Sequence, residues 1–381
     1  MTSENVPQSA AEMSIDGGGS QPEIRQDGAE LLDAVVAFLR RFIVYPDEHA
    51  LVAHALWVAH THRMDRWDST PRLAFMSAEP GSGKTRALEI TELLVSQPVL
   101  LSNVTPAYLF RRVASPDGPP TLLLDEIDVL LGKHSKSGEE IRGLINAGYK
   151  RSGKAGRCDV VDKRIEPREY AAYCAVCIGG IGELPTTIQA RAVVIEMRRR
   201  APSAEPVSVY RARESAEEGH ALRQLLSEWL NAAELAIPDL PEGIESRDAE
   251  VWEALISIAD EAGGVWPERA RVTAVTFVTL ARKARPSLGV RLLADLQVVF
   301  GDSPMLPTAA IVQQLCSLEE SPWGDLDGRP LDGRRLARML SFFGISPATI
   351  RFPSGTAKGY SRASFGDAWA RYLSEGAGNE G

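Results

Sequence analysis

The chain has 381 residues, of which 44% are hydrophobic and 24% are charged, and it contains 4 cysteines. This composition is that of a globular protein and excludes a wholly disordered chain, a collagen-like repeat and a disulfide-stabilised scaffold. No apolar run reaches the ~18 residues that a membrane-spanning helix needs, and the first residues lack the apolar core of a secretory signal. We therefore expect a cytoplasmic protein of roughly two to three domains.

The net charge of −9 is unevenly distributed along the chain. Residues 202–262 contain 14 acidic and 4 basic side chains, so this stretch alone has a net charge of −10. The remainder is near neutral and contains basic patches. The acidic total therefore does not exclude a nucleic-acid partner.

The first half of the chain predicts an α/β fold. We expect a flexible tail over residues 1–27, which are rich in Ser, Gly and Gln, and a helical segment over 28–70, where apolar residues recur at helical spacing on both sides of Pro46. From 71 to 200, short apolar runs alternate with helical stretches, which predicts a mainly parallel sheet with helices on both faces. The strands are expected at residues 72–76, 122–124, 172–178 and 193–197.

The second half predicts helices and then a small mixed domain. Residues 201–300 are expected to form an all-α lid, in which Gly263 and Gly264 end one helix and Pro267 begins the next. Residues 301–373 are expected to form a winged-helix-like domain, with strands at 350–352 and 360–362 joined by a Gly-rich wing that carries Lys358. A last helix is expected near 365–373, and a flexible tail over 374–381.

The sequence AEPGSGKT at 78–85 follows the first predicted strand and precedes a helix, which is the context that a phosphate-binding P-loop requires. Gly81 and Gly83 allow successive N–H groups to point into one concavity, to which the helix N-terminus adds positive potential. Lys84 is expected to reach the β- and γ-phosphates of ATP, and the Thr85 hydroxyl to bind Mg²⁺. The expected nucleotide contacts are Pro80, Gly81, Ser82, Gly83, Lys84, Thr85 and Arg86.

Two features qualify this P-loop. Ala78 stands where the pattern usually has its first glycine, a replacement that is mild if φ at Ala78 stays negative. The alternative is a glycine-rich turn that only begins a helix, and the sequence context disfavours it.

A second motif begins where the apolar run 121–124 ends in Asp125 and Glu126. Asp125 is expected to hold Mg²⁺, directly or through water, and Glu126 to orient and polarise the attacking water. In open α/β sheets ligands bind at the carboxyl ends of strands, so we expect this motif beside the P-loop. The alternative is that Asp125 or Asp128 only caps a helix.

With these two motifs, the chain resembles the AAA+ class of P-loop ATPases. Over residues 29–373 it also resembles a bacterial and phage-encoded family of unknown function that is often found with primase or helicase modules. The stretches that carry the resemblance are WVAHTH at 57–62, PGSGKTR at 80–86, LDEID at 124–128, LINAG at 144–148, IGELP at 181–185 and TAKGY at 356–360. The resemblance implies an ATP-driven role in the replication of phage or mobile-element DNA.

The resemblance also implies further ATPase residues. A γ-phosphate sensor is expected after the strand at 172–178, where Glu183 is the nearest polar candidate. An arginine finger that reaches a neighbouring subunit's γ-phosphate is expected at Arg191, with the three arginines at 198–200 as alternatives. In the lid, residues 246–256 resemble a helix of minichromosome-maintenance helicases that begins with a nucleotide-contacting arginine. Arg247 is therefore expected to contact the nucleotide, and Arg269 is the competing candidate.

Two basic segments are candidates for DNA contact. Residues 150–168 contain 7 basic and 3 acidic side chains, with a turn expected at Gly153 and Gly156, at the place where several ring helicases carry a basic hairpin. Residues 329–371 contain 8 basic and 2 acidic side chains, including those of a helix expected over 332–343. The alternatives are a solvated basic loop and a protein-binding surface, respectively. The candidate DNA-binding residues are Lys150, Arg151, Lys154, Arg157, Arg334, Arg335, Arg338 and Lys358.

Two further patterns do not predict a metal site. Cys174 and Cys177 have CxxC spacing, but in a strand these positions point to opposite faces. His60 and His62 are two residues apart on a helix, which does not place them on one face. We expect these cysteines to be core residues.

Together these features predict a Mg²⁺-dependent ATPase that forms a homo-oligomer with ATP sites between subunits and acts on DNA. The first hypothesis is a helicase or translocase in phage or mobile-element replication, alongside a primase or another replication partner. The alternative is an ATP-switched replication initiator, helicase loader or adaptor that binds DNA without unwinding it. A DNA-binding regulator with a vestigial nucleotide site is disfavoured by the intact acidic pair. A role in defence against phages also stays open.

Overall fold

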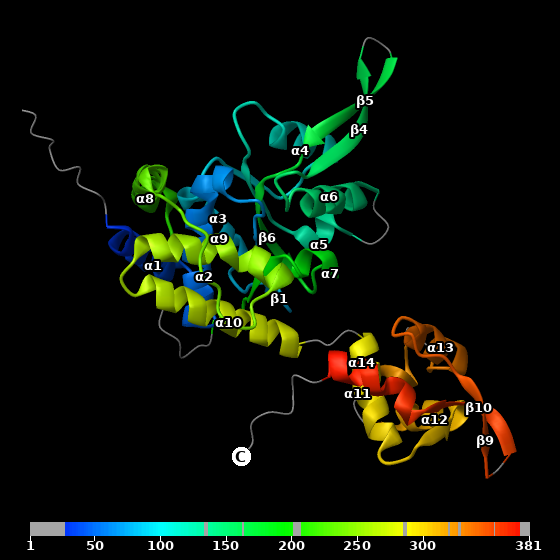
Figure 1. Cartoon of the computed structure of the whole chain (residues 1–381). Helices are drawn as coiled ribbons and strands as arrows, with labels where there is room; N and C mark the ends of the chain where they lie inside the picture. Colours follow the sequence, from blue (N-terminus) through cyan, green and yellow to red (C-terminus); the bar gives the residue numbers. More distant parts are fainter. Residues whose placement is uncertain are drawn as a thin grey trace, which may run out of the picture. The chain divides into compact units, whose positions relative to one another are not determined.

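The computed structural model describes residues 27–132, 136–161, 164–200, 207–284, 288–318, 321–326, 329–353 and 355–373. The chain forms two compact units that divide between Val278 and Thr279, coloured blue to yellow and yellow to red in Figure 1. The flexible tails expected at 1–27 and 374–381 lie outside the described residues, apart from Asp27.

Two helices precede the sheet in the first unit, as the sequence predicts. Helix α1 (Gly28–Phe42) begins at Asp27, whose carboxylate accepts a hydrogen bond from the Ala29 backbone N–H at 2.9 Å. Helix α2 (Glu48–His60) begins in the same way at Asp47, and a 3₁₀ turn (Thr61–Arg66) follows it. Helix α2 is apolar on nearly all sides, which suits its place between α1, the sheet and helix α9 (Ser246–Ala262).

The sheet of the first unit has five strands in the order β2-β3-β6-β1-β7, and all its pairings are parallel. This confirms the predicted parallel sheet. The sequence analysis missed β2, a four-residue strand at the sheet edge that begins with proline. The strands are β1 (Arg72–Ser77), β2 (Pro98–Leu101), β3 (Thr121–Leu124), β6 (Ala175–Ile181) and β7 (Ala192–Glu196).

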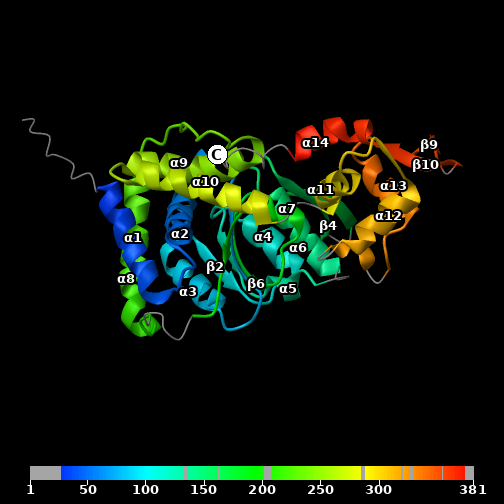
Figure 2. The ribbon, with the colours of Figure 1, turned by 90° about the horizontal axis from the view of Figure 1, so that it is seen from below.

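Helices cover both faces of this sheet, as predicted, and alternate strand residues enter two different cores. Leu73 and Phe75 of β1 belong to one core, and Ala74 and Met76 to the other. The first face packs against α3 (Lys84–Leu94), which lies beside α2 in Figure 2. The opposite face is covered by α4 (Pro106–Val113), α5 (Ile127–Leu130), α6 (Lys136–Ala147) and α7 (Thr186–Gln189).

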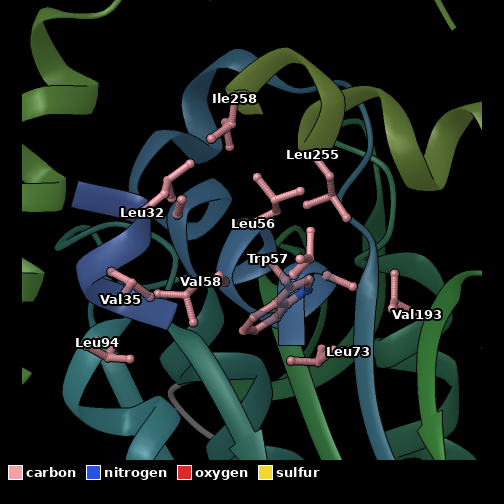
Figure 3. Packing of buried hydrophobic residues seen from close by; sticks show 14 of the residues in the cluster. Leu32, Val35, Leu56, Trp57, Val58, Leu73, Leu94, Val193, Leu255 and Ile258 are labelled. Atoms are coloured by element: carbon pink, nitrogen blue, oxygen red, sulfur yellow. The ribbon is translucent and has the colours of Figure 1, made fainter. Parts of the chain in front are cut away.

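The first of these cores extends from the sheet into the helices that follow β7. Trp57 of α2 is fully buried at its centre, and its indole N–H donates to the Pro71 carbonyl at 2.8 Å. Figure 3 shows Leu255 and Ile258 packing toward Leu32 and Leu56 from above. The added helices are α8 (Ala212–Ala232), α9 (Ser246–Ala262) and α10 (Trp266–Ala284).

The four cysteines are unpaired. Cys177 lies in the core on the α3 side of the sheet and Cys174 in the core on the opposite side. Both are buried, which confirms their prediction as core residues on opposite faces. Within the described part of the chain, no group of three or more His, Cys, Asp or Glu side chains is arranged to hold a metal ion.

Three histidines in this unit are held neutral by burial. Burial lowers the pKa of His54 to about 3 and the pKa of His60 and of His62 to about 4. The ring nitrogens of His54 hydrogen-bond to Tyr45 and Thr91, so the neutral imidazole is well satisfied.

These histidines predict acid sensitivity. Below about pH 6.5 the unfolded chain protonates these three histidines while the folded chain does not, so stability falls as the pH drops from about 6.5 toward 4. Three such groups contribute up to about 4 kcal/mol per pH unit in this window. Urea unfolding is therefore expected to have a lower midpoint at pH 5.5 than at pH 7.5. An unchanged or higher midpoint at pH 5.5 contradicts this account.

An antiparallel hairpin of β4 (Lys154–Val161) and β5 (Arg164–Ala171) projects from this unit (Figure 1). The expected turn is confirmed at Gly153, whose N–H donates to the Lys150 carbonyl at 2.8 Å, but it is wrong at Gly156, which lies within β4. Gly153 lies at the base of the hairpin, where a Cβ atom would come within 1.8 Å of the Ala147 carbonyl. This close approach explains the glycine.

The second unit contains four helices within its described residues and a three-stranded sheet of order β8-β10-β9. The expected wing is shorter than predicted: Lys358 lies within β10, paired with Thr349 of β9, because the antiparallel pairing continues through the glycine-rich stretch. Every helix in the described part of the chain is too short or too polar to cross a membrane. The elements are α11 (Leu288–Phe300), β8 (Met305–Pro307), α12 (Thr308–Ser317), α13 (Gly333–Ser341), β9 (Ala348–Phe352), β10 (Gly355–Ser361) and α14 (Gly366–Tyr372), with 3₁₀ turns at Pro322–Gly324 and Arg362–Phe365.

Candidate nucleotide site

The loop between β1 and α3 has the backbone of an anion-binding turn. Gly81 and Gly83 adopt φ values of +79° and +89°, which only glycine adopts without strain. Ala78 is absent from the residues with positive φ, so alanine is tolerated there. Gly83 directly precedes α3, and it offers no side chain to cap the first N–H groups of that helix. These N–H groups are therefore available to an anion.

The Lys84 side chain is folded into this loop. Its ammonium donates to the hydroxyls of Ser77 at 2.6 Å and Ser82 at 3.1 Å, and it lies 3.5 Å from the Glu79 carbonyl. Burial lowers the pKa of Lys84, and the charges of Asp125 and Asp128 oppose that shift. The ammonium therefore lies within the loop, close enough to Asp125 and Asp128 for their charges to act on it.

The two sequence motifs meet at a hydrogen bond. The Thr85 hydroxyl donates to Asp125 Oδ2 at 2.8 Å, although the two residues are 40 positions apart. Asp125 directly follows the buried strand β3, and its backbone N–H donates to the Leu101 carbonyl at 2.9 Å. The structure thus places a hydroxyl and a carboxylate oxygen together beside the ammonium of Lys84.

Glu126 occupies an unusual backbone conformation. Its φ of +54° and ψ of +44° lie in the left-handed region, which is strained for a residue other than glycine. The Asp125 carboxylate accepts a hydrogen bond from the Glu126 N–H at 2.9 Å, which helps to hold this conformation. The Glu126 side chain is exposed, and within the described residues it has no hydrogen-bond partner. It is therefore free to bind a water molecule.

The end of β6 differs from the expectation. The strand spans Ala175–Ile181 rather than 172–178, so Gly179 and Gly180 are paired with Phe75 and Met76 of β1. A Cβ atom at Gly179 would come within 2.8 Å of Leu88 and 3.1 Å of Asp125. The glycines therefore leave room for α3 and for the acidic segment, which is the physical reason that no polar side chain stands at this point.

Asp128 was not predicted as a site residue, but it occupies the end of β6. Its carboxylate accepts a hydrogen bond from the Ile181 N–H at 2.9 Å, and a Cβ atom at Gly180 would lie 3.1 Å from the same oxygen. Glu183, the expected sensor candidate, lies two residues beyond this strand. In the sequence, Asp128 is the third acidic residue of the LDEID segment. The sequence analysis names it only as an alternative helix cap and not as a site residue.

The donor set at this point suits a magnesium ion. Mg²⁺ prefers oxygen ligands and usually takes one or two carboxylates together with waters and substrate phosphates. The Thr85 hydroxyl and the Asp125 carboxylate provide such oxygens within 2.8 Å of each other. When Mg²⁺ binds with a nucleotide, waters and phosphate oxygens supply the rest of its ligands. The Thr85 hydroxyl and the Asp125 carboxylate therefore fit a magnesium ion without further protein ligands.

Arg191 lies far from the loop between β1 and α3 of its own chain. It precedes Ala192, which pairs with Arg72 at the start of β1, whereas the P-loop follows the end of β1. Five residue steps of about 3.3 Å separate these two ends of the strand, roughly 17 Å. The Arg191 guanidinium donates to the Thr187 carbonyl at 2.5 Å and lies 5.4 Å from the centre of the Tyr149 ring.

Arg247 is placed on the same side as Arg191. It lies exposed at the start of α9, one turn before Glu250, which accepts hydrogen bonds from the Tyr149 hydroxyl and from Lys150. Partial burial raises the pKa of Glu250, but the bonds from Lys150 and Tyr149 and the charge of Arg247 lower it overall. The structure therefore groups Arg247 with Arg191 and not with Lys84.

Arg269 and Arg199, two of the four alternative arginines, have different surroundings. Arg269 lies 4.7 Å from the Trp266 ring centre and forms ion pairs with Asp33 and Glu48, so its contacts hold α10 against α1 and α2. Arg199, by contrast, lies against the P-loop, where its Nε donates to the Pro80 carbonyl at 3.0 Å.

Arg86 lies in the first turn of α3. Its guanidinium is 4.7 Å from the centre of the Tyr210 ring, and it forms an ion pair with Glu89 at 3.2 Å. The backbone of Arg86 lies at the helix start, next to the other expected nucleotide contacts.

The predicted DNA-binding residues at the hairpin all have partners within the unit. Lys150 is paired with Glu250, and Lys154 with Glu169 at 2.6 Å. Arg151 donates to the carbonyls of Trp67 and Met64, and Arg157 lies 4.0 Å from the centre of the Phe110 ring. Of these four side chains, Lys150, Arg151 and Lys154 remain exposed despite their partners and Arg157 is partly buried; Arg164 and Arg168 on β5 are exposed as well.

In the second unit, the four predicted DNA-binding residues divide into two kinds. Arg334 and Arg338 lie four positions apart on α13 and are exposed, as is Lys358 on β10. Arg335 donates to the Leu326 carbonyl at 2.8 Å and is partly buried, so it supports the fold of the unit. A cavity of about 530 Å³ is lined by Arg334, Lys358 and Asp332, among others.

Comparisons with known proteins give a family but no assigned activity. Residues 196–372 match a family model described as a protein of unknown function (DUF3631), so the P-loop and Asp125 lie outside that match. The chain is also 46% identical over 182 residues to an uncharacterised 28.9 kDa protein in the xis 5′ region of Saccharopolyspora erythraea. That likeness covers 46% of this chain and 68% of that protein.

Two solved structures are distantly similar. One is the A form apo structure of the NrS-1 C-terminal region, with 12% identity and a TM-score of 0.45, covering 87% of this chain and 75% of that chain. The other is a full-length MCM homolog from Methanopyrus kandleri, with 15% identity and a TM-score of 0.35, covering 72% of this chain and 62% of that chain. At these scores, neither likeness establishes a shared function.

Proposed function

This chain belongs to the protein family of the uncharacterised 28.9 kDa protein of Saccharopolyspora erythraea, and from its own site we propose that it is a Mg²⁺-dependent ATPase that acts on DNA. The observation that carries the proposal is the hydrogen bond of 2.8 Å from the Thr85 hydroxyl to the Asp125 carboxylate. It lies at the start of α3, where Lys84 is the first residue and where no side chain caps the helix. This is the combination of N–H groups, cation and metal-binding oxygens that a nucleoside triphosphate with its ion requires.

The roles of the residues follow from their chemistry. The N–H groups of the loop from Pro80 to Thr85 bind phosphate oxygens, and Lys84 exchanges Ser77 and Ser82 for the β- and γ-phosphates. Thr85 and Asp125 hold Mg²⁺, which supplies charge neutralisation of the phosphates when it is bound. Glu126 orients a water molecule for attack on the γ-phosphorus and accepts its proton.

The position of Arg191 supports an ATP site shared between subunits. Because it lies at the opposite end of β1 from its own P-loop, it serves as an arginine finger only for a neighbouring copy. Arg247, which lies on the same side, is proposed to contact the same neighbouring nucleotide. A homo-oligomer is therefore part of the proposal.

The variant Arg191→Ala is expected to bind ATP like the wild type but to lose turnover by orders of magnitude, because the finger stabilises charge only in the transition state. Mixing it with Lys84→Ala is expected to restore part of the activity, since mixed interfaces then pair an intact loop with an intact arginine. Steady-state hydrolysis by the two variants, alone and mixed, measures this. Normal hydrolysis by Arg191→Ala contradicts the shared site.

DNA contact is supported by exposed cations on two surfaces. On the hairpin the candidates stay Lys150, Arg151, Lys154 and Arg157, joined by Arg164 and Arg168, because exposed ion pairs such as Lys154–Glu169 contribute little that would oppose an exchange for phosphates. In the second unit, Arg334 and Arg338 of α13 and Lys358 of β10 form the other surface. Cations of this kind bind phosphates without reading sequence.

The choice between a helicase and an ATP-switched loader or adaptor needs an activity measurement. Unwinding of a forked DNA substrate with ATP supports the helicase. ATP hydrolysis that is stimulated by single-stranded DNA without unwinding supports the loader or adaptor. If DNA neither binds nor stimulates hydrolysis, the DNA part of the proposal is wrong while the ATPase part stands.

The domain assignment belongs to the same proposal. We propose an AAA+-like core over residues 71–200 preceded by a helical segment over 28–70, a helical lid over 201–300 and a winged-helix-like domain over 301–373. The parallel sheet with its P-loop supports the first assignment, and helices α12 and α13 followed by the β9–β10 hairpin support the last.

A further inference from the structure

Arg199 lies against the P-loop because of the pairing of β7. Glu196 of β7 is the partner of Met76 of β1, and the Met197 N–H donates to the Met76 carbonyl at 2.7 Å. The chain that leaves β7 therefore runs beside the chain that enters the loop. Arg199 Nε then donates to the Pro80 carbonyl at 3.0 Å, and its Nη2 lies 3.5 Å from the Glu79 carboxylate.

The same two loop residues are approached by Lys84. The Lys84 ammonium is 3.5 Å from the Glu79 carbonyl, so Lys84 and Arg199 both contact the Glu79–Pro80 segment of the loop. A Cβ atom at Gly81 would lie 3.7 Å from Arg199 Nε. Since Lys84 of a P-loop reaches the β- and γ-phosphates, the guanidinium of Arg199 lies beside the place of the outermost phosphate.

We propose that Arg199 binds the γ-phosphate of ATP in its own subunit, an inference that rests on the proposed ATPase function. In this state Nε stays on the Pro80 carbonyl, and the two terminal nitrogens turn from Glu79 to phosphate oxygens. The ion pair with Glu79 is 62% and 69% exposed at its two side chains, so it contributes little that would oppose the exchange. A guanidinium binds phosphate through two parallel charged hydrogen bonds, which are stronger.

This role differs from that of Arg191. Arg191 lies at the start of β7 and is proposed to serve a neighbouring subunit, whereas Arg199 follows the end of the same strand and serves its own. An arginine of the same chain can stabilise phosphoryl transfer, as one supplied by a partner does. The two arginines therefore contribute to two different ATP sites.

The first test is calorimetric titration of the full chain with Mg–ATP and with Mg–ADP. The variant Arg199→Ala is expected to bind ATP about 10- to 100-fold more weakly and ADP with unchanged affinity, because only ATP has the γ-phosphate. Arg199→Lys, which keeps the charge without the paired donors, is expected to lie between. The matched control is Arg213→Ala, which removes an arginine that is 82% exposed and is expected to bind both nucleotides like the wild type.

A second pair of variants separates phosphate binding from neutralisation of Glu79. If Arg199 only neutralises that carboxylate, Glu79→Gln in the Arg199→Ala background restores ATP affinity, which would overturn the proposal. If Arg199 binds phosphate, the double variant stays weak. Thermal unfolding of each variant confirms that the unit is folded, and Arg199 is exposed enough for the substitution to be tolerated.

Mixing experiments then assign the subunit. Arg199→Ala mixed with Lys84→Ala is expected to show no restored turnover, because every intact loop in the mixture lacks its own Arg199. Restored turnover overturns the proposal and makes Arg199 a partner-directed residue. Wild-type protein that binds neither nucleotide overturns the ATPase function and this inference with it. Wild-type binding with unchanged ATP affinity in Arg199→Ala overturns this inference alone.

Discussion

The variant Glu126→Gln is expected to bind Mg–ATP with wild-type affinity and to hydrolyse it at least about 100-fold more slowly. The Glu126 side chain is exposed and, among the described residues, makes no hydrogen bond that ATP binding would depend on. Glutamine keeps the shape of the side chain and its ability to hold a water molecule, but it cannot accept the proton of that water. The loss therefore falls on turnover and not on affinity. Single-turnover hydrolysis alongside calorimetry separates the two.

The matched control for this variant is Glu234→Gln, which neutralises an exposed glutamate outside the site. It is expected to hydrolyse ATP at the wild-type rate. A Glu126→Gln variant with normal turnover would show that another group activates the water, and Asp128 at the end of β6 would then be the next candidate.

The variant Lys84→Ala is expected to lose measurable ATP and ADP binding. In the structure the ammonium lies within the loop, held by Ser77 and Ser82, at the point where the phosphates would enter. Its removal deletes the one buried cation that faces Asp125 and Asp128 in the described part of the site. The phosphates would then meet carboxylates without a neutralising charge. Calorimetric titration with Mg–ATP measures the loss.

Folding is not expected to explain that loss. The Lys84 ammonium bonds only to groups of its own loop, Ser77, Ser82 and the Glu79 carbonyl, so we expect alanine at this position to leave the unit folded; thermal unfolding of the variant measures this. Lys136→Ala, which removes an exposed lysine at the start of α6, is the control and is expected to bind ATP normally. Wild-type affinity in Lys84→Ala would contradict the assigned loop.

The parts of the site that could be predicted from the sequence are those fixed by local chemistry. Gly81 and Gly83 were placed by a spacing that only a tight turn with positive φ explains, and both adopt it. Lys84 and Thr85 follow this turn directly, and Asp125 follows a run that is apolar enough to be a central strand. The parallel sheet and the two N-terminal helices followed from periodicity in the same way.

The parts that could not be predicted depend on contacts between distant segments. The strand β6 continues through Gly179 and Gly180, which have low strand propensity, because it pairs with β1 and must admit α3 closely. Arg199 reaches the loop between β1 and α3 only because β7 lies next to β1. Neither the pairing of β6 with β1 nor that of β7 with β1 can be predicted from a single sequence.

The basic residues show the same limit. Lys150, Arg151, Lys154 and Arg157 form a cluster of charge in the sequence, and charge alone predicts a nucleic-acid surface. In the fold, each is matched by a carboxylate, a carbonyl or an aromatic ring from another segment or the facing strand. Only the three-dimensional arrangement shows which of these cations already have a partner and which of them stay exposed.

The most direct test of the account is calorimetric titration of the wild-type chain with ATP in the presence and absence of Mg²⁺. The account predicts binding of a single nucleotide per chain, with an affinity that falls when Mg²⁺ is removed or when Asp125 is replaced by asparagine. Absence of any binding heat for ATP under both conditions, in a protein that is folded by thermal unfolding, would contradict the central claim that the Thr85–Asp125 pair and the glycine loop form a nucleotide site.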